Sequence, residues 1–225
     1  MRTTRPCSDA TDTTPALDAP GRGRLIVLEG MPGAGKTTIA EHLSGAGVPV
    51  LGEYTTSAGA TLAHADHPGV ADDDAHQANW LLKTAQAEPL LAVHPTVVAD
   101  RDWLSALAYA HSIDDEELLA ARVSWVVDQL RAGWLLVPAL YVVFDLEPSA
   151  SLDRRHDADA GHPWSRIEPL ERLRRFYLAP GRAVAAFDPL LCALLRVQPM
   201  VRLSGHNARR VNVTAVRDIL TGEPS

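Results

Sequence analysis

Short apolar runs and longer amphipathic stretches alternate along most of the 225-residue chain. The apolar runs have the length of buried strands, and they predict strands within residues 25–28, 48–52, 96–99, 140–144 and 200–203. Helical periodicity fills the intervals, within residues 36–43, 74–91, 103–111, 118–130, 149–156, 167–178, 182–196 and 211–220. Strands that alternate with helices predict an α/β fold, in which a five-stranded parallel sheet is covered by helices on both faces.

Breaks in this pattern set the expected boundaries. Residues 1–22 lack periodicity and contain several Pro, Thr and Asp, so we expect a disordered tail before a single domain at 23–225. Residues 112–115, Ser-Ile-Asp-Asp, resemble a capping box at the start of a helix. Residues 157–163 are polar and contain a glycine, which predicts a mobile loop within a lid near 154–166.

Residues 30–37 carry the clearest chemical signature in the chain. They fit the phosphate-loop pattern G-x-x-x-x-G-K-[ST] between a predicted strand and a predicted helix, which assigns the sheet to the P-loop NTPase fold. Glycines take positive φ, so successive N–H groups approach and cradle phosphate oxygens. We expect Lys36 to contact the β and γ phosphates of ATP and the Thr37 hydroxyl to bind Mg²⁺. The residues expected around the nucleotide are Gly30, Met31, Pro32, Gly33, Ala34, Gly35, Lys36, Thr37, Thr38 and, from the lid, Arg166.

Composition narrows the function classes. The net charge of −7 argues against a general nucleic-acid binder. The two cysteines, Cys7 and Cys192, are too few for a disulfide framework. No apolar run approaches the ~20 residues of a membrane span, and no signal core is present, so we expect a cytoplasmic protein without a membrane partner.

Lysine is rare in this chain. Lys36 and Lys83 are its two lysines among 21 Lys and Arg residues. Such a bias, with abundant Ala, points to genomic base composition rather than function. Against that background, a lysine at position 36 indicates that arginine does not serve there.

Polar residues follow the second and third predicted strands, where ligands of parallel sheets bind. Asp100 is a candidate for holding a water of the Mg²⁺ shell, and Arg101 for binding a phosphate or stabilising the transferred phosphoryl group. Glu53 is a candidate general base toward a hydroxyl, with hydrogen bonding to a sugar or a base as an alternative. For Asp100 and Arg101, the alternative is a surface salt bridge. For Glu53, the alternative is a solvated glutamate before a loop.

Three arginines, Arg154, Arg155 and Arg166, flank the polar loop at 157–163. Closure of the loop over ATP would bring them to the phosphates and exclude water, whereas solvated arginines on helices are the alternative. On the acceptor side, Gln77 offers an amide to a nucleobase edge, and Trp80 offers an indole wall. The catalytic candidates are Lys36, Glu53, Arg101, Arg154 and Arg155. The acceptor-side candidates are Glu53, Gln77, Trp80, Arg101, Trp103 and Tyr109.

Three segments together resemble one family. Residues 28–38 read Leu-Glu-Gly-Met-Pro-Gly-Ala-Gly-Lys-Thr-Thr. Asp100 and Arg101 are followed by Ser-Ala-Leu-Ala-Tyr at 105–109, and Leu-Tyr-Val-Val-Phe-Asp-Leu-Glu-Pro at 140–148 has arginines behind it. This order is similar to the thymidylate kinase-like group, which includes the deoxynucleoside kinases, along residues 24–220. The resemblance implies a five-stranded sheet, ATP with Mg²⁺, and an arginine-bearing lid.

The segment after the second strand departs from both subgroups. Thymidylate kinases have Arg-Glu-Pro-Gly-Gly-Thr there, whereas residues 52–56 read Gly-Glu-Tyr-Thr-Thr, without the arginine and the paired glycines. Deoxynucleoside kinases have Glu-Pro there and Glu-Arg-Ser after the third strand, where residues 100–102 read Asp-Arg-Asp. By this resemblance Glu53 matches their presumed base, and Gln77 falls near their base-reading glutamine.

We therefore expect an ATP-dependent kinase that moves the γ-phosphate to a small acceptor, a nucleoside or a nucleotide. A phosphotransferase acting on a specialised metabolite, such as an antibiotic hydroxyl, is one alternative, and a non-catalytic nucleotide switch is another. A small-molecule acceptor is the expected partner, nucleic acid and membrane are not expected, and a homodimer stays open. Likeness of fold does not fix the acceptor.

Overall fold

The structure of the chain, a computed structural model, describes residues 23–69, 72–155 and 161–222. The predicted tail at 1–22 lies outside these residues, as do positions 157–160 of the predicted lid loop. No helix in the described ranges combines the length and the apolarity needed to cross a membrane.

A five-stranded parallel sheet forms the centre of the molecule, with strand order β2-β3-β1-β4-β5. The strands are β1 (Arg24–Gly30), β2 (Val50–Leu51), β3 (Thr96–Asp100), β4 (Leu140–Asp145) and β5 (Met200–Ser204). The predicted P-loop NTPase fold with its five-stranded parallel sheet is thereby confirmed. In the central pair, Leu28 of β1 lies opposite Asp100 of β3, so the phosphate loop and the residues after β3 leave the sheet side by side.

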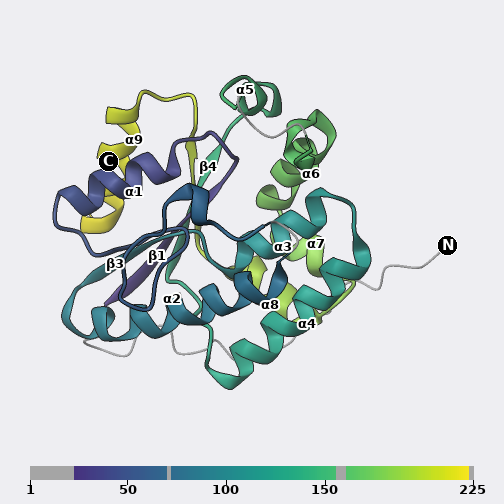
Figure 1. Cartoon of the computed structure of the whole chain (residues 1–225), viewed down its shortest axis with the longest axis horizontal. Helices are drawn as coiled ribbons and strands as arrows, with labels where there is room; N and C mark the ends of the chain where they lie inside the picture. Colours follow the sequence, from purple (N-terminus) through teal and green to yellow (C-terminus); the bar gives the residue numbers. More distant parts are fainter. Residues whose placement is uncertain (1–22, 70–71, 156–160, 223–225) are drawn as a thin grey trace.

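Helices cover both faces of the sheet (Figure 1). Helices α1 and α9 pack together on one face, α2 packs on the other, and α3, α4 and α6 continue the layer on that side. The longer helices are α1 (Lys36–Gly45), α2 (Asp73–Val93), α3 (Trp103–Ser112), α4 (Glu116–Ala132), α6 (Ile167–Leu178), α8 (Pro189–Val197) and α9 (Arg209–Thr221). The short ones are α5 (Pro148–Asp153), α7 (Pro180–Val184) and the 3-10 turns η1 (His64–Asp66) and η2 (Pro163–Ser165). Burial of both sheet faces explains why the central strands are continuous apolar runs.

The helix predicted over 182–196 is a correction, because the chain forms two helices there, α7 and α8. Pro189 has no N–H with which to continue a helix from the preceding turn, and it starts α8 instead. Asp188 caps this new helix by accepting the Leu191 N–H at 2.7 Å.

Two further boundaries differ from the prediction. The strand expected at 48–52 pairs over Val50–Leu51. The cap of α4 is Asp115, which accepts the Leu118 N–H at 2.9 Å, and it is not Ser112. Ser112 ends α3, where its hydroxyl donates to the Tyr109 carbonyl oxygen at 2.7 Å.

Candidate active site

The phosphate loop connects β1 to α1. Gly30 takes φ 122°, and a Cβ atom there would lie 2.3 Å from the Phe144 carbonyl oxygen, so a side chain does not fit. Gly35 takes φ 91° where α1 begins. The buried Lys36 ammonium donates to the carbonyl oxygens of Gly30 and Met31, at 3.1 and 2.9 Å. An ammonium held by neutral carbonyls can exchange them for phosphate oxygens without breaking an ion pair.

Thr37 and Asp100 meet beside this loop. The Thr37 hydroxyl donates to Asp100 Oδ2 at 2.7 Å. Asp100 Oδ1 is buried and has no hydrogen-bond partner among the described residues, which is a costly arrangement for a carboxylate oxygen. Hydroxyl and carboxylate oxygens are ligands that Mg²⁺ accepts directly or through water. The two residues therefore fit a Mg²⁺ ion at the edge of the phosphate loop.

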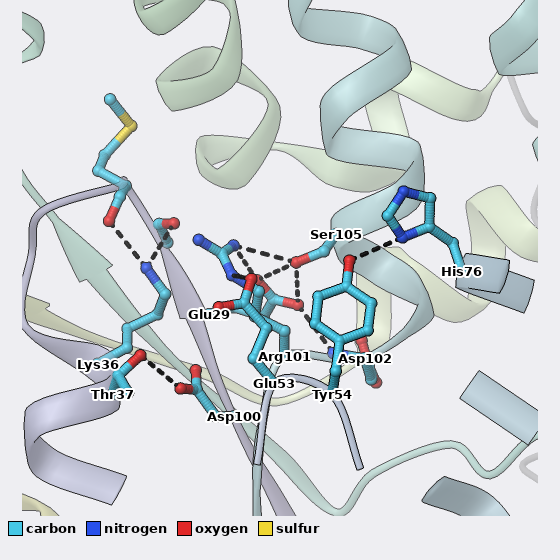
Figure 2. A network of polar contacts seen from close by, with 12 residues as sticks. Glu29, Lys36, Thr37, Glu53, Tyr54, His76, Asp100, Arg101, Asp102 and Ser105 are labelled. Atoms are coloured by element: carbon cyan, nitrogen blue, oxygen red, sulfur yellow. Dashed lines mark hydrogen bonds and ion pairs between the residues drawn. The ribbon is translucent and has the colours of Figure 1, made fainter. Parts of the chain in front are cut away.

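Arg101 lies next to them, in an unusual backbone conformation. It takes φ 65°, the left-handed region that side chains disfavour, and the residue is 8% exposed. Its Nε lies 2.8 Å from Glu53 Oε1, and its Nη1 lies 3.6 Å from Glu29 Oε2 (Figure 2). The guanidinium thus joins an acid of β1 to the acid that follows β2.

Glu29 is a site residue that the sequence prediction missed. Its side chain is fully buried and accepts hydrogen bonds from the Ser105 hydroxyl at 2.8 Å, the Tyr177 hydroxyl at 2.8 Å and the Asp102 N–H at 3.2 Å. A buried carboxylate persists when it is paired and hydrogen-bonded in this way. The available signal was one acid at the end of an otherwise apolar strand, directly before the phosphate loop.

The electrostatics favour an anion between the loop and Arg101. Burial, and after it the charge of Arg101, lower the pKa of Lys36 to about 7. Burial and Arg101 also lower the pKa of Arg155. When neighbouring cations lower one another's pKa, an anion that binds between them relieves their repulsion. For Glu53, burial opposes ionisation, but Arg101 and Lys36 hold its pKa below the ordinary value, so it is a carboxylate at neutral pH.

Helix α2 holds the segment that follows β2. Asn79 donates to the Glu53 carbonyl oxygen at 3.0 Å and accepts the Thr55 N–H at 3.1 Å. Gln86 accepts the Thr55 hydroxyl at 2.9 Å and donates to the Thr56 carbonyl oxygen at 2.6 Å. The position of Glu53 is therefore set by a helix and does not depend on a free loop.

Lys83 lies on the same face of α2. Its ammonium donates to the carbonyl oxygens of Asp100 and Arg101, each at 2.7 Å. Burial lowers its pKa to about 8, against the opposing charge of Asp100 and other nearby acids. The spacing of Asn79, Lys83 and Gln86 places them on one helical face, a signal that the sequence prediction did not use.

Trp80 and Trp103, which the sequence predicts on the acceptor side, both have side chains that belong to the hydrophobic core. Trp103 is 2% exposed, and its indole N–H donates to the Leu136 carbonyl oxygen at 3.0 Å. Trp80 is 5% exposed, and its ring stacks with that of Tyr54 at a centroid distance of 6.1 Å. Their contact with an acceptor stays a prediction.

The other two acceptor-side candidates are half-buried. Gln77 lies on α2, and Tyr109 lies on α3, with its ring 5.6 Å from the Trp164 ring and 5.3 Å from the Arg122 guanidinium carbon. Their roles toward an acceptor stay predictions.

The structure brings two of the three lid arginines to Gly33 of the phosphate loop, where a Cβ atom would lie 3.3 Å from Arg154 Cβ and 3.6 Å from Arg155 Cγ. Arg154 Nη1 donates to the Gly33 carbonyl oxygen at 3.1 Å and to that of Gly205 at 2.9 Å. Arg155 Nη1 donates to the Trp164 carbonyl oxygen at 3.2 Å. Arg166 is exposed at the start of α6. Its contact with a nucleotide stays a prediction.

Comparisons with known proteins agree with this geometry. Residues 25–160 match the AAA domain family, so the chain belongs to that family. The chain is also 30% identical, over 115 residues, to a probable thymidylate kinase from Methanosarcina mazei. This match covers 51% of the chain and 52% of the relative, so the chain spans about half the length of the curated relative it matches.

Solved structures show the same fold at low identity. A deoxyadenosine kinase from M. mycoides, with the products dCMP and dCDP bound, superposes with a TM-score of 0.54 at 13% identity, over 88% of this chain and 99% of that one. A thymidylate kinase from Candida albicans superposes with a TM-score of 0.57 at 17% identity, over 89% and 92% of the two chains. The predicted resemblance to the thymidylate kinase-like and deoxynucleoside kinase-like group is confirmed.

Proposed function

We propose that this protein is an ATP-dependent kinase that transfers the γ-phosphate to a small acceptor, a nucleoside or a nucleotide. The observation that carries the proposal is the pairing of Arg101 with Glu53 directly beside the Lys36 end of the phosphate loop. This arrangement supplies a cationic place for the transferred group and a carboxylate for the acceptor within one cluster. A binding module that senses nucleotide has no need of the carboxylate.

The nucleotide side of the reaction falls to the phosphate loop. The loop N–H groups cradle the phosphates of ATP, and Lys36 leaves its two carbonyl partners to contact the β and γ phosphates. Thr37 and Asp100 would hold Mg²⁺, which when bound would neutralise phosphate charge. The charge of Arg101 lowers the pKa of Arg155, so the two guanidinium groups interact. Arg155 adds positive charge as the phosphoryl group moves.

The acceptor side falls to Glu53 and Arg101. Binding of the phosphoryl group by Arg101 weakens its pairing with Glu53, and the carboxylate is then available to an acceptor hydroxyl. A carboxylate so placed accepts the proton of the hydroxyl as the new P–O bond forms. We therefore favour an alcohol acceptor, as in a nucleoside, over a monophosphate, which needs no base.

The names of the relatives support the acceptor class. The curated relative is a probable thymidylate kinase, and one structural neighbour is a deoxyadenosine kinase. These proteins act on a nucleotide and on a nucleoside. Residues 52–56 of this chain match the pattern of neither subgroup, so the acceptor is to be found by experiment.

The experiment is a measurement of ADP formation from ATP and Mg²⁺ with a panel of deoxynucleosides, ribonucleosides and their monophosphates. We expect one member to raise ADP formation well above the rate without acceptor, and the phosphorylated product to appear in equal amount. An aminoglycoside panel run in parallel tests an antibiotic hydroxyl. ATP binding without turnover on any panel member would contradict the kinase and favour the nucleotide switch.

A further inference from the structure

Lys83 is the lysine of this chain that lies outside the phosphate loop. It lies on α2, is 5% exposed, and is one of two lysines among 21 Lys and Arg residues. A buried lysine in an arginine-rich chain indicates that the compact ammonium is required, because the wider, planar guanidinium cannot take its place.

The ammonium of Lys83 faces three main-chain carbonyl groups from two separate strand ends. The carbonyl oxygens of Asp100 and Arg101, after β3, each lie 2.7 Å from Nζ, and that of Glu53, after β2, lies at 3.4 Å. The Trp80 ring lies on another side, with its centroid 5.8 Å from Nζ. An ammonium has three N–H donors that diverge from one atom, which suits three convergent acceptors.

These contacts fix the backbone of Arg101 from both ends. The Arg101 N–H donates to the Leu28 carbonyl oxygen at 3.0 Å, and its own carbonyl oxygen accepts from Lys83. The residue between these bonds has φ 65°. A strained conformation of this kind persists only when its surroundings over-determine it. The same ammonium approaches the carbonyl of Glu53, the ion-pair partner of Arg101.

We propose that Lys83 is a positioning residue for phosphoryl transfer, whose ammonium joins the ends of β2 and β3 and holds Arg101 in the left-handed conformation that faces Glu53. Lys83 does not touch the reacting groups; it acts through Arg101. The inference rests on the proposed kinase function for its kinetic consequence. Its structural part, the restraint of Arg101, stands independently of the reaction.

The first test is Lys83→Met, which keeps the apolar stem and removes the donors. We expect kcat to fall by about 10–100-fold with the panel member that the wild type phosphorylates fastest, because small displacements of a charge-stabilising group are costly. The KM for ATP should change by less than about threefold, since the phosphate loop is untouched. Lys83→Gln, which keeps two N–H donors, serves if Lys83→Met does not fold.

The second test is a double-mutant cycle with Arg101→Lys. If Lys83 acts through Arg101, Lys83→Met should lower kcat by less than about threefold in the Arg101→Lys background. A general structural role of Lys83 would lower kcat by the same factor in both backgrounds. That additive result would overturn the proposal.

The third test is amide hydrogen exchange, which needs no turnover. We expect faster exchange at Arg101 and Asp102 in Lys83→Met. Gln86→Leu is the matched control, since Gln86 lies on the same helix face and contacts Thr55 and Thr56 after β2. It should speed exchange near those residues and leave Arg101 and Asp102 unchanged.

The outcomes separate the two proposals. Absence of turnover in the wild type contradicts the kinase function, and hydrogen exchange then decides the role of Lys83 alone. Wild-type turnover with unchanged exchange at Arg101 in Lys83→Met contradicts the role of Lys83 and leaves the kinase function standing. Faster exchange at Arg101 together with a non-additive cycle supports both.

Discussion

The two sides of the phosphate loop hold their charged side chains in different ways. On the β2 and β3 side, Arg101 is 8% exposed and lies between two acids, Glu29 and Glu53. On the α5 and α6 side, Arg154 is exposed and Arg155 is half-buried, and both donate to main-chain carbonyl groups. The charges of the first side form a buried network of ion pairs, whereas Arg154 and Arg155 on the second side donate to neutral acceptors.

This difference indicates which half of the site is built before the substrates arrive. Charge-assisted hydrogen bonds in a buried network are strong. Removing one partner leaves the other as a buried, unpaired charge, which is destabilising. An arginine on a carbonyl oxygen exchanges that partner for a phosphate oxygen at a gain. We infer that the β2 and β3 side is preformed. On the α5 and α6 side, we infer that Arg154 and Arg155 reach their final positions only when the nucleotide binds.

The largest expected effect belongs to Lys36, which stands between the two sides. We predict that Lys36→Ala lowers kcat by about 10³-fold without unfolding the protein, because an oriented ammonium stabilises charge that develops during transfer. Steady-state ADP formation measures the effect, and circular dichroism verifies the fold. Lys36→Arg should not restore turnover, since its wider, planar group does not fit the two carbonyl positions. Wild-type turnover in Lys36→Ala would remove the phosphate loop from the mechanism.

The next effect tests the preformed side at Glu53. We predict that Glu53→Gln, which keeps the shape and removes the charge, lowers kcat by about 10²-fold and leaves ATP binding within about threefold. Glu41→Gln, an exposed acid of α1, is the control that should change neither. Single-turnover kinetics and binding of a fluorescent ATP analogue measure the two quantities.

Other outcomes at Glu53 carry their own meaning. A normal kcat would exclude Glu53 as the base and favour a monophosphate acceptor, which is nucleophilic without one. Loss of ATP binding would place Glu53 in the Mg²⁺ shell instead. Each result would change what the preformed side is built to receive.

The fold was predictable from the sequence to a large extent, because its signals are local. Apolar runs marked each strand, and the eight-residue pattern at 30–37 marked the phosphate loop in its strand and helix context. The helix predicted over 182–196 failed where Asp188 caps a new helix at Pro189. That signal was also local, and it was outweighed by the apolar periodicity around it.

The site was predictable only in part, since its other determinants are contacts between distant residues. Arg101 and Glu53 were found because both follow strands, yet Glu29 was missed because its partners Ser105 and Tyr177 come from other elements. The sequence also did not show that Trp80 belongs to the hydrophobic core. A sequence position on α2 does not tell which helical face turns toward the sheet.

A moderate effect is expected on the α5 and α6 side. We predict that Arg155→Gln lowers kcat by about 10-fold, because the charge of Arg101 acts on Arg155. We predict that Arg154→Gln instead raises the KM for ATP by about threefold, because Arg154 donates to the carbonyl oxygens of Gly33 and Gly205. Arg131→Gln, an exposed arginine of α4, is the control. Equal effects of the two lid variants would break the distinction between them.

The smallest effect concerns how far the preformed side extends from Glu53. The hydroxyl of the neighbouring Tyr54 lies 2.7 Å from His76 Nδ1, and His76 Nε2 lies 3.1 Å from the Gly69 carbonyl oxygen. A carbonyl only accepts, so the neutral ring carries its proton on Nε2, and Nδ1 accepts from the Tyr54 hydroxyl. Protonation of Nδ1 removes that acceptor.

The pH dependence that follows has a definite sign. Burial lowers the pKa of His76 below its ordinary value of 6.5, in spite of the Gly69 carbonyl, so the unfolded chain binds the proton more tightly than the folded one. The stabilisation is therefore complete above about pH 6.5 and is lost as the pH falls through the lowered pKa. We predict that this group lowers the melting temperature by on the order of 1 °C between about pH 7 and about pH 5.5. His76→Gln should remove this step from a thermal melt, and His42→Gln, at an exposed histidine of α1, should keep it. An unchanged step in His76→Gln would end the preformed side at Glu53, and would mean that the Tyr54 ring is held by packing alone.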